Sequence, residues 1–159
     1  MARGGIPFIT GDHAALNGPG AHQDVAAIRR FEDIEAWQCA RRLHSSLEKA
    51  LETGAFHRAA LADQLERSAS SSMANIAEGY DAGWDREFIR FLKFAKRSAS
   101  EFQSHLYAAL DSRQCSQAQF DDLYDQAAET KRLIGGFIRY LESTLSSPSR
   151  RARPQAGPS

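Results

Sequence analysis

The sequence has no proline between residues 20 and 147, and its five prolines all lie near the two ends. Because proline removes a backbone donor and breaks helix interiors, this gap permits long helices. Long apolar runs are also missing, and none approaches the ~18 residues needed to span a bilayer. The N-terminus has no apolar run behind basic residues, as a secretory signal would. We therefore expect a cytoplasmic protein with no membrane segment.

The sequence also has only two cysteines and no net charge. Cys39 and Cys115 lie in separate segments without metal-ligand spacing, so we expect reduced thiols. The formal net charge is zero, and residues 24–145 hold 16 Lys and Arg against 19 Asp and Glu. This balance excludes a globally basic nucleic-acid binder. Any such binding must depend on a local basic patch.

Catalytic and metal-binding motifs are absent too. The sequence has no glycine-rich phosphate loop, no Gly-x-Ser-x-Gly and no Glu-x-x-His of the kind found in di-iron bundles. Glu101 and His105 are four residues apart but have no counterpart on another segment. We interpret them as a solvated or hydrogen-bonded pair rather than as metal ligands. We expect no enzymatic activity, no metal and no cofactor.

What is present is a central block with helical periodicity. Residues 1–30 are predicted to be a flexible arm, and residues 146–159 a flexible tail rich in Arg, Pro and Ser. Between them, apolar residues recur every three or four positions and predict helices over 31–52, 57–78 (stopped by Gly79), 85–111 and 116–145. The connections are short, so sequential helices should be antiparallel. The prediction is an all-α, up-down-up-down four-helix bundle at 31–145.

Aromatic residues mark the expected core and an expected contact between subunits. Trp37 and Phe91 fall on the inward stripes of their helices and are expected in the core. Phe88, Ile89, Phe91 and Phe94 together cover more than one face of the helix at 85–111. A single bundle buries one stripe, so this surplus indicates packing against a second subunit.

Three stretches together resemble a known bacterial family: FEDIEAWQCARRL at 31–43, QLERSASSSMANIAEGY at 64–80 and REFIRFLKFAKRSASEF at 86–102. The chain resembles the four-helix-bundle family of 23S rRNA intervening-sequence proteins, which includes the accessory variability proteins of diversity-generating retroelements. The residues that carry this resemblance, with structural roles implied, are Asp33, Trp37, Asn75, Glu78, Gly79, Phe88 and Phe91.

The resemblance implies a ring-shaped homopentamer of antiparallel bundles without enzymatic activity. In the retroelement branch it also implies binding to RNA or DNA and to a reverse transcriptase. The alternative is an intervening-sequence type of structural or protein-interaction ring with no nucleic-acid partner. Both alternatives stay open at the level of sequence.

Three positions depart from the family pattern. Met73 stands where the family usually has a proline, and Glu66 stands where it usually has a basic residue. Trp84 replaces the usual serine cap, so Asp85 is expected to cap the following helix. The change at Glu66 weakens the expectation of nucleic-acid binding.

Asn75 and Glu78 lie in the expected last turn of the second helix, where a carboxylate faces the negative end of the helix dipole. Glu78 could accept hydrogen bonds from free N–H groups at residues 85–87, or pair with Arg86 or Arg90. Asn75 could satisfy freed carbonyls. We favour this architectural interpretation over a ligand or nucleic-acid role.

A line of basic residues follows one face of the third helix. Arg86, Arg90, Lys93 and Arg97 are spaced at i, i+4, i+7 and i+11, and Lys96 flanks them. We call these five residues the basic stripe. It is either a phosphate-contacting strip, extended by the tail arginines, or a solvated face or partner for acidic residues such as Asp121, Asp122, Asp125 and Glu129. The net acidity of the bundle favours the second interpretation. No aromatic residue is interleaved for base stacking, so any binding should lack base specificity.

Overall fold

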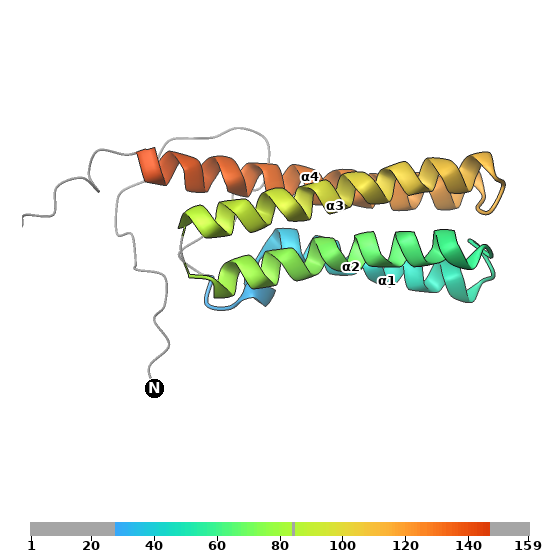
Figure 1. The fold of residues 1–159 in the computed structure, drawn as a ribbon, viewed down its shortest axis with the longest axis horizontal. Coiled ribbons are helices and arrows are strands. Elements are labelled where there is room, and N and C mark those ends of the chain that lie inside the picture. Colours follow the sequence, from blue (N-terminus) through green and yellow to red (C-terminus); the bar gives the residue numbers. More distant parts are fainter. Residues whose placement is uncertain (1–27, 84, 147–159) are drawn as a thin grey trace, which may run out of the picture.

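The computed structural model describes residues 28–83 and 85–146, and within these ranges it contains helices but no strand. The elements are the 3-10 helix η2 (Phe31–Asp33), α1 (Glu35–Glu52), α2 (Ala59–Asp81), α3 (Asp85–Asp111) and α4 (Gln117–Ser146) (Figure 1). The all-α, four-helix prediction is confirmed. No described helix combines the length and the apolar character needed to cross a membrane.

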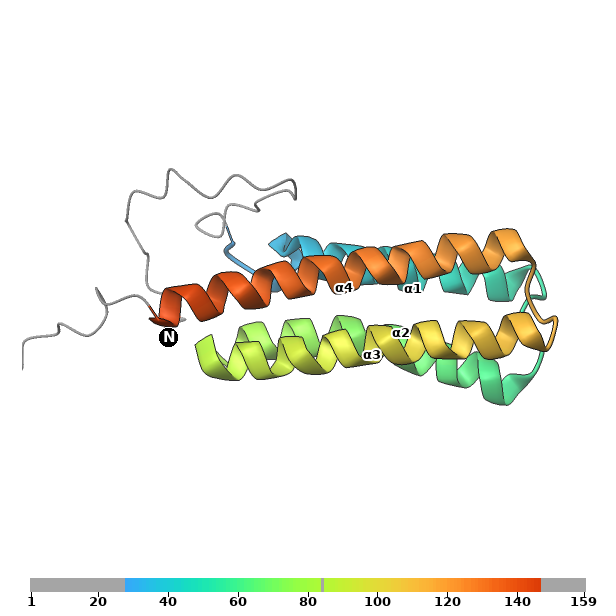
Figure 2. The same cartoon turned by 90° about the horizontal axis from the view of Figure 1, so that it is seen from above.

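The four helices lie side by side in the order α1, α2, α3, α4, and α4 returns to pack on α1 (Figures 1 and 2). Hydrogen bonds between helices show their directions. From α2 to α3, the Ser71 and Ser98 hydroxyls are 3.0 Å apart, and the Ser72 hydroxyl donates to the Ala95 carbonyl at 3.1 Å. Seven residues further along α2, a Cβ on Gly79 would lie 2.6 Å from Phe91 Cβ, so the residue number rises on α2 as it falls on α3, and these two helices run in opposite directions.

Gln114 joins the two connections at one end of the bundle. Its carbonyl accepts a hydrogen bond from the N–H of Phe56 at 2.8 Å, and its side-chain oxygen accepts one from the N–H of Arg58 at 2.9 Å. Both Phe56 and Gln114 are buried. The α1–α2 and α3–α4 connections are thus fixed to one another by backbone groups that would otherwise lack partners.

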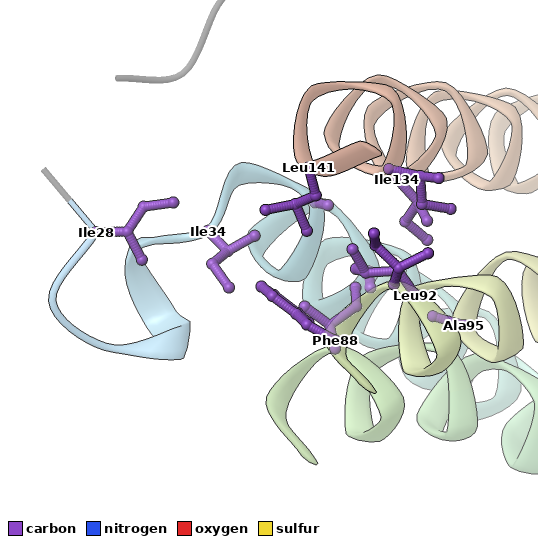
Figure 3. Packing of buried hydrophobic residues seen from close by; sticks show 12 residues of the cluster. Ile28, Ile34, Phe88, Leu92, Ala95, Ile134 and Leu141 are labelled. Carbon is purple, nitrogen blue, oxygen red and sulfur yellow. The ribbon is translucent and has the colours of Figure 1, made fainter. Parts of the chain in front are cut away.

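The core is divided into two apolar clusters along the bundle. The first includes Phe88, Leu92 and Ile134 (Figure 3), and the second includes Leu43, Phe102 and Leu123. Between them lies a middle layer of small buried residues, which consists of Cys39, Ser72, Ala99 and Thr130. The Thr130 hydroxyl approaches Cys39 Sγ at 3.3 Å and donates to the Gln126 carbonyl at 2.8 Å. The polar atoms of this layer are therefore satisfied although they are buried.

Gly79 does not stop α2, which corrects the sequence prediction. The helix continues to Asp81, and the glycine with a left-handed backbone is Gly83, at φ 70°. Gly79 is buried inside the helix. A side chain does not fit there, because a Cβ would lie 2.6 Å from Phe91 Cβ and 2.8 Å from Phe88 Cδ2. The glycine is required by the close approach of α3 rather than by a turn.

The start of the bundle also differs from the prediction. The helix predicted to begin at residue 31 begins at Glu35, after the separate 3-10 turn η2. Ile28, placed by the sequence in the flexible arm, is buried in the first core cluster. The rest of the predicted arm and tail, residues 1–27 and 147–159, lies outside the described residues.

Trp37 and Phe91 are only partly buried, so their assignment to the core was wrong. Trp37 packs against the edge of the first cluster, whereas its neighbour Ala36 points inward. Phe88 and Ile89, counted in the aromatic surplus of α3, are instead buried in the core of their own bundle. Of that surplus, only Phe91 and Phe94 remain partly or largely exposed.

Candidate nucleic-acid interface

All five residues of the basic stripe lie exposed on α3, which is unbroken over its whole length. Two of the five are paired with carboxylates. Arg90 Nη1 lies 3.0 Å from Glu87 Oε1, one turn earlier on α3, and Lys93 Nζ lies 3.2 Å from Glu142 Oε1 on α4. These exposed pairs each contribute little stability, but they reduce the local positive charge.

The other three residues, Arg86, Lys96 and Arg97, form no ion pair with any residue in 28–83 or 86–146. Three of the α4 carboxylates that the sequence offered as partners for the stripe bind other residues. Gln117 donates to Asp121, Gln126 donates to Asp122, and Arg132 pairs with Glu129 at 2.6 Å. Three of the five cations of the basic stripe therefore stay exposed without an ion pair in the described part of the chain.

α4 adds cations that the sequence analysis missed. A Cβ built on Gly135 would lie 3.5 Å from Lys96 Nζ and 3.6 Å from Arg139 Nη1, so both cationic groups converge over this glycine. Arg139 is exposed and has no ion pair within the described chain. Nearby, Lys131 Nζ donates to Gln103 Oε1 at 2.9 Å. Helical periodicity assigns each residue to a face of its own helix but does not align two helices, so it could not reveal this convergence.

The corner formed by Asn75 and Glu78 differs from its predicted arrangement. Glu78 is exposed, and its side chain forms no hydrogen bond or ion pair with the described residues, including Arg86 and Arg90. Asn75 donates to the Ser71 carbonyl at 2.8 Å and to the Ser71 hydroxyl at 3.1 Å. It therefore binds a carbonyl inside α2 rather than the freed carbonyls at the helix end. The expected cap at Asp85 and the departure at Trp84 lie outside the described side chains.

Asp33 and Trp37 organise the entry to the bundle. Asp33 accepts hydrogen bonds from the N–H groups of Arg29 at 2.9 Å and Arg30 at 3.2 Å, and Arg30 Nε lies 3.6 Å away. The bond from the Arg29 N–H is the largest of the causes that lower the pKa of Asp33. Trp37 packs edge-on against Phe31, with 5.1 Å between ring centroids, and the guanidinium of Arg41 lies 5.9 Å from the Trp37 ring.

Phe91 and Phe94 form a second aromatic feature beside the basic stripe. Their ring centroids are 6.3 Å apart, and the guanidinium of Arg90 lies 5.7 Å from each ring. Phe94 is 37% exposed. At Met73, where the sequence departs from the family pattern, α2 is continuous, and the methionine side chain packs on the first core cluster.

An open groove of about 500 Å³ lies between α2 and α3, lined by Gln64, Arg67, Ser68, Ser71 and Glu101. Glu101 Oε1 lies 3.6 Å from His105 Nε2. No group of three or more His, Cys, Asp and Glu side chains that could hold a metal occurs in the described residues. The groove is polar but has only one cation, so the greater positive charge lies on the α3–α4 side.

The family model described as "23S rRNA-intervening sequence protein" matches residues 32–136, from η2 into the second half of α4. A comparison with curated proteins finds no match. The matched range contains the whole basic stripe and ends at the glycine pair of α4.

Proposed function

The chain belongs to the 23S rRNA-intervening sequence protein family, and from this premise we propose that it is a non-enzymatic, cytoplasmic accessory protein of the diversity-generating retroelement type. In this role it assembles as a homo-oligomer, a pentamer if it follows the resemblance, and binds nucleic acid and a reverse transcriptase. The observation that carries the nucleic-acid part is the set of exposed cations without a carboxylate partner in the described chain: Arg86, Lys96, Arg97 and Arg139.

Exposed unpaired cations favour a polyanionic partner for a simple physical reason. Each cation that neutralises a phosphate releases a counterion, and this release drives binding without any base contact. One bundle offers a few such groups and would bind weakly. Repetition in an oligomer raises the effective concentration of the remaining sites after the first has bound.

A second candidate function, a protein-interaction ring with no nucleic-acid partner, is favoured by different residues. Arg90 and Lys93 are already paired with Glu87 and Glu142, which removes part of the charge that phosphates would meet. Phe94 and Arg90 lie together on the surface, and aromatic residues and arginine are enriched in protein interfaces. The two candidates differ in whether the basic stripe meets phosphate.

We expect the purified protein to be an oligomer at micromolar concentration. The exposed Phe94 and the partly buried Phe91 are the apolar surface of α3 that its own bundle leaves uncovered. Sedimentation equilibrium measures the mass directly. A Phe94→Glu variant should shift the equilibrium toward smaller species while its helicity by circular dichroism is unchanged. A monomeric parent protein would contradict the proposed assembly.

We expect two variants with the same change in charge to differ in nucleic-acid affinity. Arg86→Gln/Arg97→Gln removes two unpaired cations, whereas Arg90→Gln/Lys93→Gln removes two cations that already have carboxylate partners. The first variant should weaken binding more and should reduce the slope of log K against log salt by up to ~2, at ~0.9 per lost contact. Fluorescence anisotropy with a labelled oligonucleotide at 50 and 200 mM salt measures both quantities.

The outcomes of this comparison separate the two candidates. Binding by the parent protein that the first variant weakens more supports the unpaired cations as phosphate contacts. Equal weakening by both variants would mean that net charge, rather than the unpaired groups, governs binding. Absence of binding by the parent at 50 mM salt would overturn the nucleic-acid part and favour the protein-interaction ring.

A further inference from the structure

The surface where α3 and α4 meet carries a line of polar, cationic and aromatic side chains, which we call the α3–α4 seam. On α3 the line consists of Lys93, Lys96, Ser100, Gln103 and Tyr107, at helical spacings of three and four. Contacts to α4 place it on the seam. Lys93 meets Glu142, Lys96 lies over Gly135, and Gln103 donates to the Tyr124 carbonyl at 3.3 Å. The two helices run side by side over this whole length (Figure 1).

The middle of the seam is suited to a phosphate. Lys96 Nζ and Arg139 Nη1 both lie within 3.6 Å of the position that a Cβ of Gly135 would occupy. Neither has a carboxylate partner within 28–83 or 86–146, and both residues are exposed. The two like charges on this small surface repel each other, and an anion between them would offset that repulsion. A phosphate oxygen there would accept charge-assisted hydrogen bonds from both.

The far end of the seam presents an aromatic ring to solvent. Tyr107 is 50% exposed, although its ring centroid lies 5.0 Å from that of Phe120 and 5.7 Å from that of Tyr124. A hydrogen bond with Tyr124 is the largest cause that raises the pKa of the Tyr107 phenol. The neighbouring rings of Phe120 and Tyr124 hold Tyr107 in place while half of its surface stays free. A fixed, exposed ring is the feature on which single-strand binders stack bases.

The distance between the two features fits a short single strand. Lys96 and Tyr107 are separated by 11 residues of one helix, or ~16 Å at ~1.5 Å per residue, which a few nucleotides can span. Between them, Ser100 is exposed, whereas Gln103 is buried and bonds to the Tyr124 carbonyl and Lys131, and this line of α3 carries no carboxylate. Glu142, beyond the cationic part, is already paired with Lys93.

We propose that the α3–α4 seam binds a single-stranded nucleic acid, with a phosphate held by Lys96 and Arg139 and a base stacked on Tyr107. This inference rests on the proposed binding of nucleic acid and adds that the bound form is a single strand rather than a duplex. Stacking on Tyr107 needs an unpaired base, so the seam prefers single strands to duplex. The expectation that no aromatic residue is available for stacking considered only the basic stripe of α3, and the exposed ring of Tyr107 lies about three turns beyond it.

The experiment measures the affinity of the full chain for a 20-nucleotide oligo(dT) and for a 20-base-pair duplex by fluorescence anisotropy. The parent should bind the single strand more tightly. Tyr107→Leu keeps an apolar side chain against Phe120 but removes the ring, and should weaken single-strand binding by about 5- to 150-fold with the duplex unaffected. Tyr107→Phe, the matched control, should retain most of the affinity. Lys96→Gln/Arg139→Gln should weaken binding to both ligands.

Tyr107→Trp gives a second test that does not depend on losing a side chain. Its fluorescence should be quenched by oligo(dT) more than that of the parent, because a stacked base lies against the new indole. Equal single-strand affinity of Tyr107→Leu and parent, or tighter binding to duplex, would overturn the seam while leaving nucleic-acid binding intact. If the parent binds neither ligand at low salt, the proposed nucleic-acid binding fails and the inference fails with it. Thermal melts of each variant verify that it is folded.

Discussion

Replacing Phe102 by alanine is expected to lower the free energy of unfolding by about 3–5 kcal/mol. Phe102 is 0% exposed and is one of the largest fully buried side chains, at the centre of the second core cluster. Close-packed neighbours on all four helices cannot collapse into the space, so the loss includes a cavity in addition to the lost transfer of the ring from water. Urea unfolding followed by circular dichroism measures the change.

Phe94→Ala is the matched control, because it removes the same ring from the same helix. Phe94 is 37% exposed and lies outside both core clusters, so its removal should destabilise the protein much less. Both variants must be compared at one protein concentration, since assembly couples stability to concentration. Equal losses from the two variants would mean that Phe94 is buried in the assembled protein.

Gly79→Ala is expected to destabilise the protein by about 1–3 kcal/mol, although alanine is the better helix former. The added Cβ would lie 2.6 Å from Phe91 Cβ, an atom close to the α3 backbone that cannot rotate away. Relief therefore requires α2 and α3 to separate at this point. The melting temperature and the urea midpoint should both fall.

Gly136→Ala tests the same exchange where there is room. Gly136 is also inside a helix, but a Cβ there meets only the flexible end of Arg139, at 3.9 Å. Here the helix propensity should dominate and stabilise the protein by up to ~1 kcal/mol. Opposite signs for the two variants would support close packing at Gly79, whereas stabilisation by both would show that α3 does not press on that glycine.

The helices could be predicted from sequence because hydrophobic periodicity and the absence of proline are properties of each segment by itself and do not depend on contacts between helices. The predicted and observed ranges of α3 coincide at 85–111, and those of α4 differ by a residue at each end. Gly79 was misjudged for a related reason. A glycine near the end of a helical pattern indicates a stop, and only the position of Phe91 on the next helix shows why it is needed inside α2.

Helix faces and the candidate site could be predicted only in part. Trp37 lies at the edge of an apolar stripe, and spacings of three and four do not distinguish the centre of a stripe from its edge. The basic stripe was visible because all its members share one helix. Arg139 joins it only across the α3–α4 seam, where helix packing that one sequence does not reveal brings it beside Lys96. Tyr107 shares α3 with the stripe, but its packing against Phe120 and Tyr124 and its remaining exposure depend on the same contact between helices.

The middle layer has a consequence for helix register. Apolar residues repeat so regularly along four long helices that a shift of one helix by a single turn would bury a similar apolar area. Such a shift would take the buried Ser72 hydroxyl away from the Ala95 carbonyl of the neighbouring helix. It would also separate Thr130 from Cys39, although Thr130 would keep its bond to the Gln126 carbonyl of its own helix. A buried hydroxyl without a partner costs about 1–3 kcal/mol. The few polar atoms at the centre of the bundle thus select one sliding position among several, as a single buried polar residue does in a coiled coil.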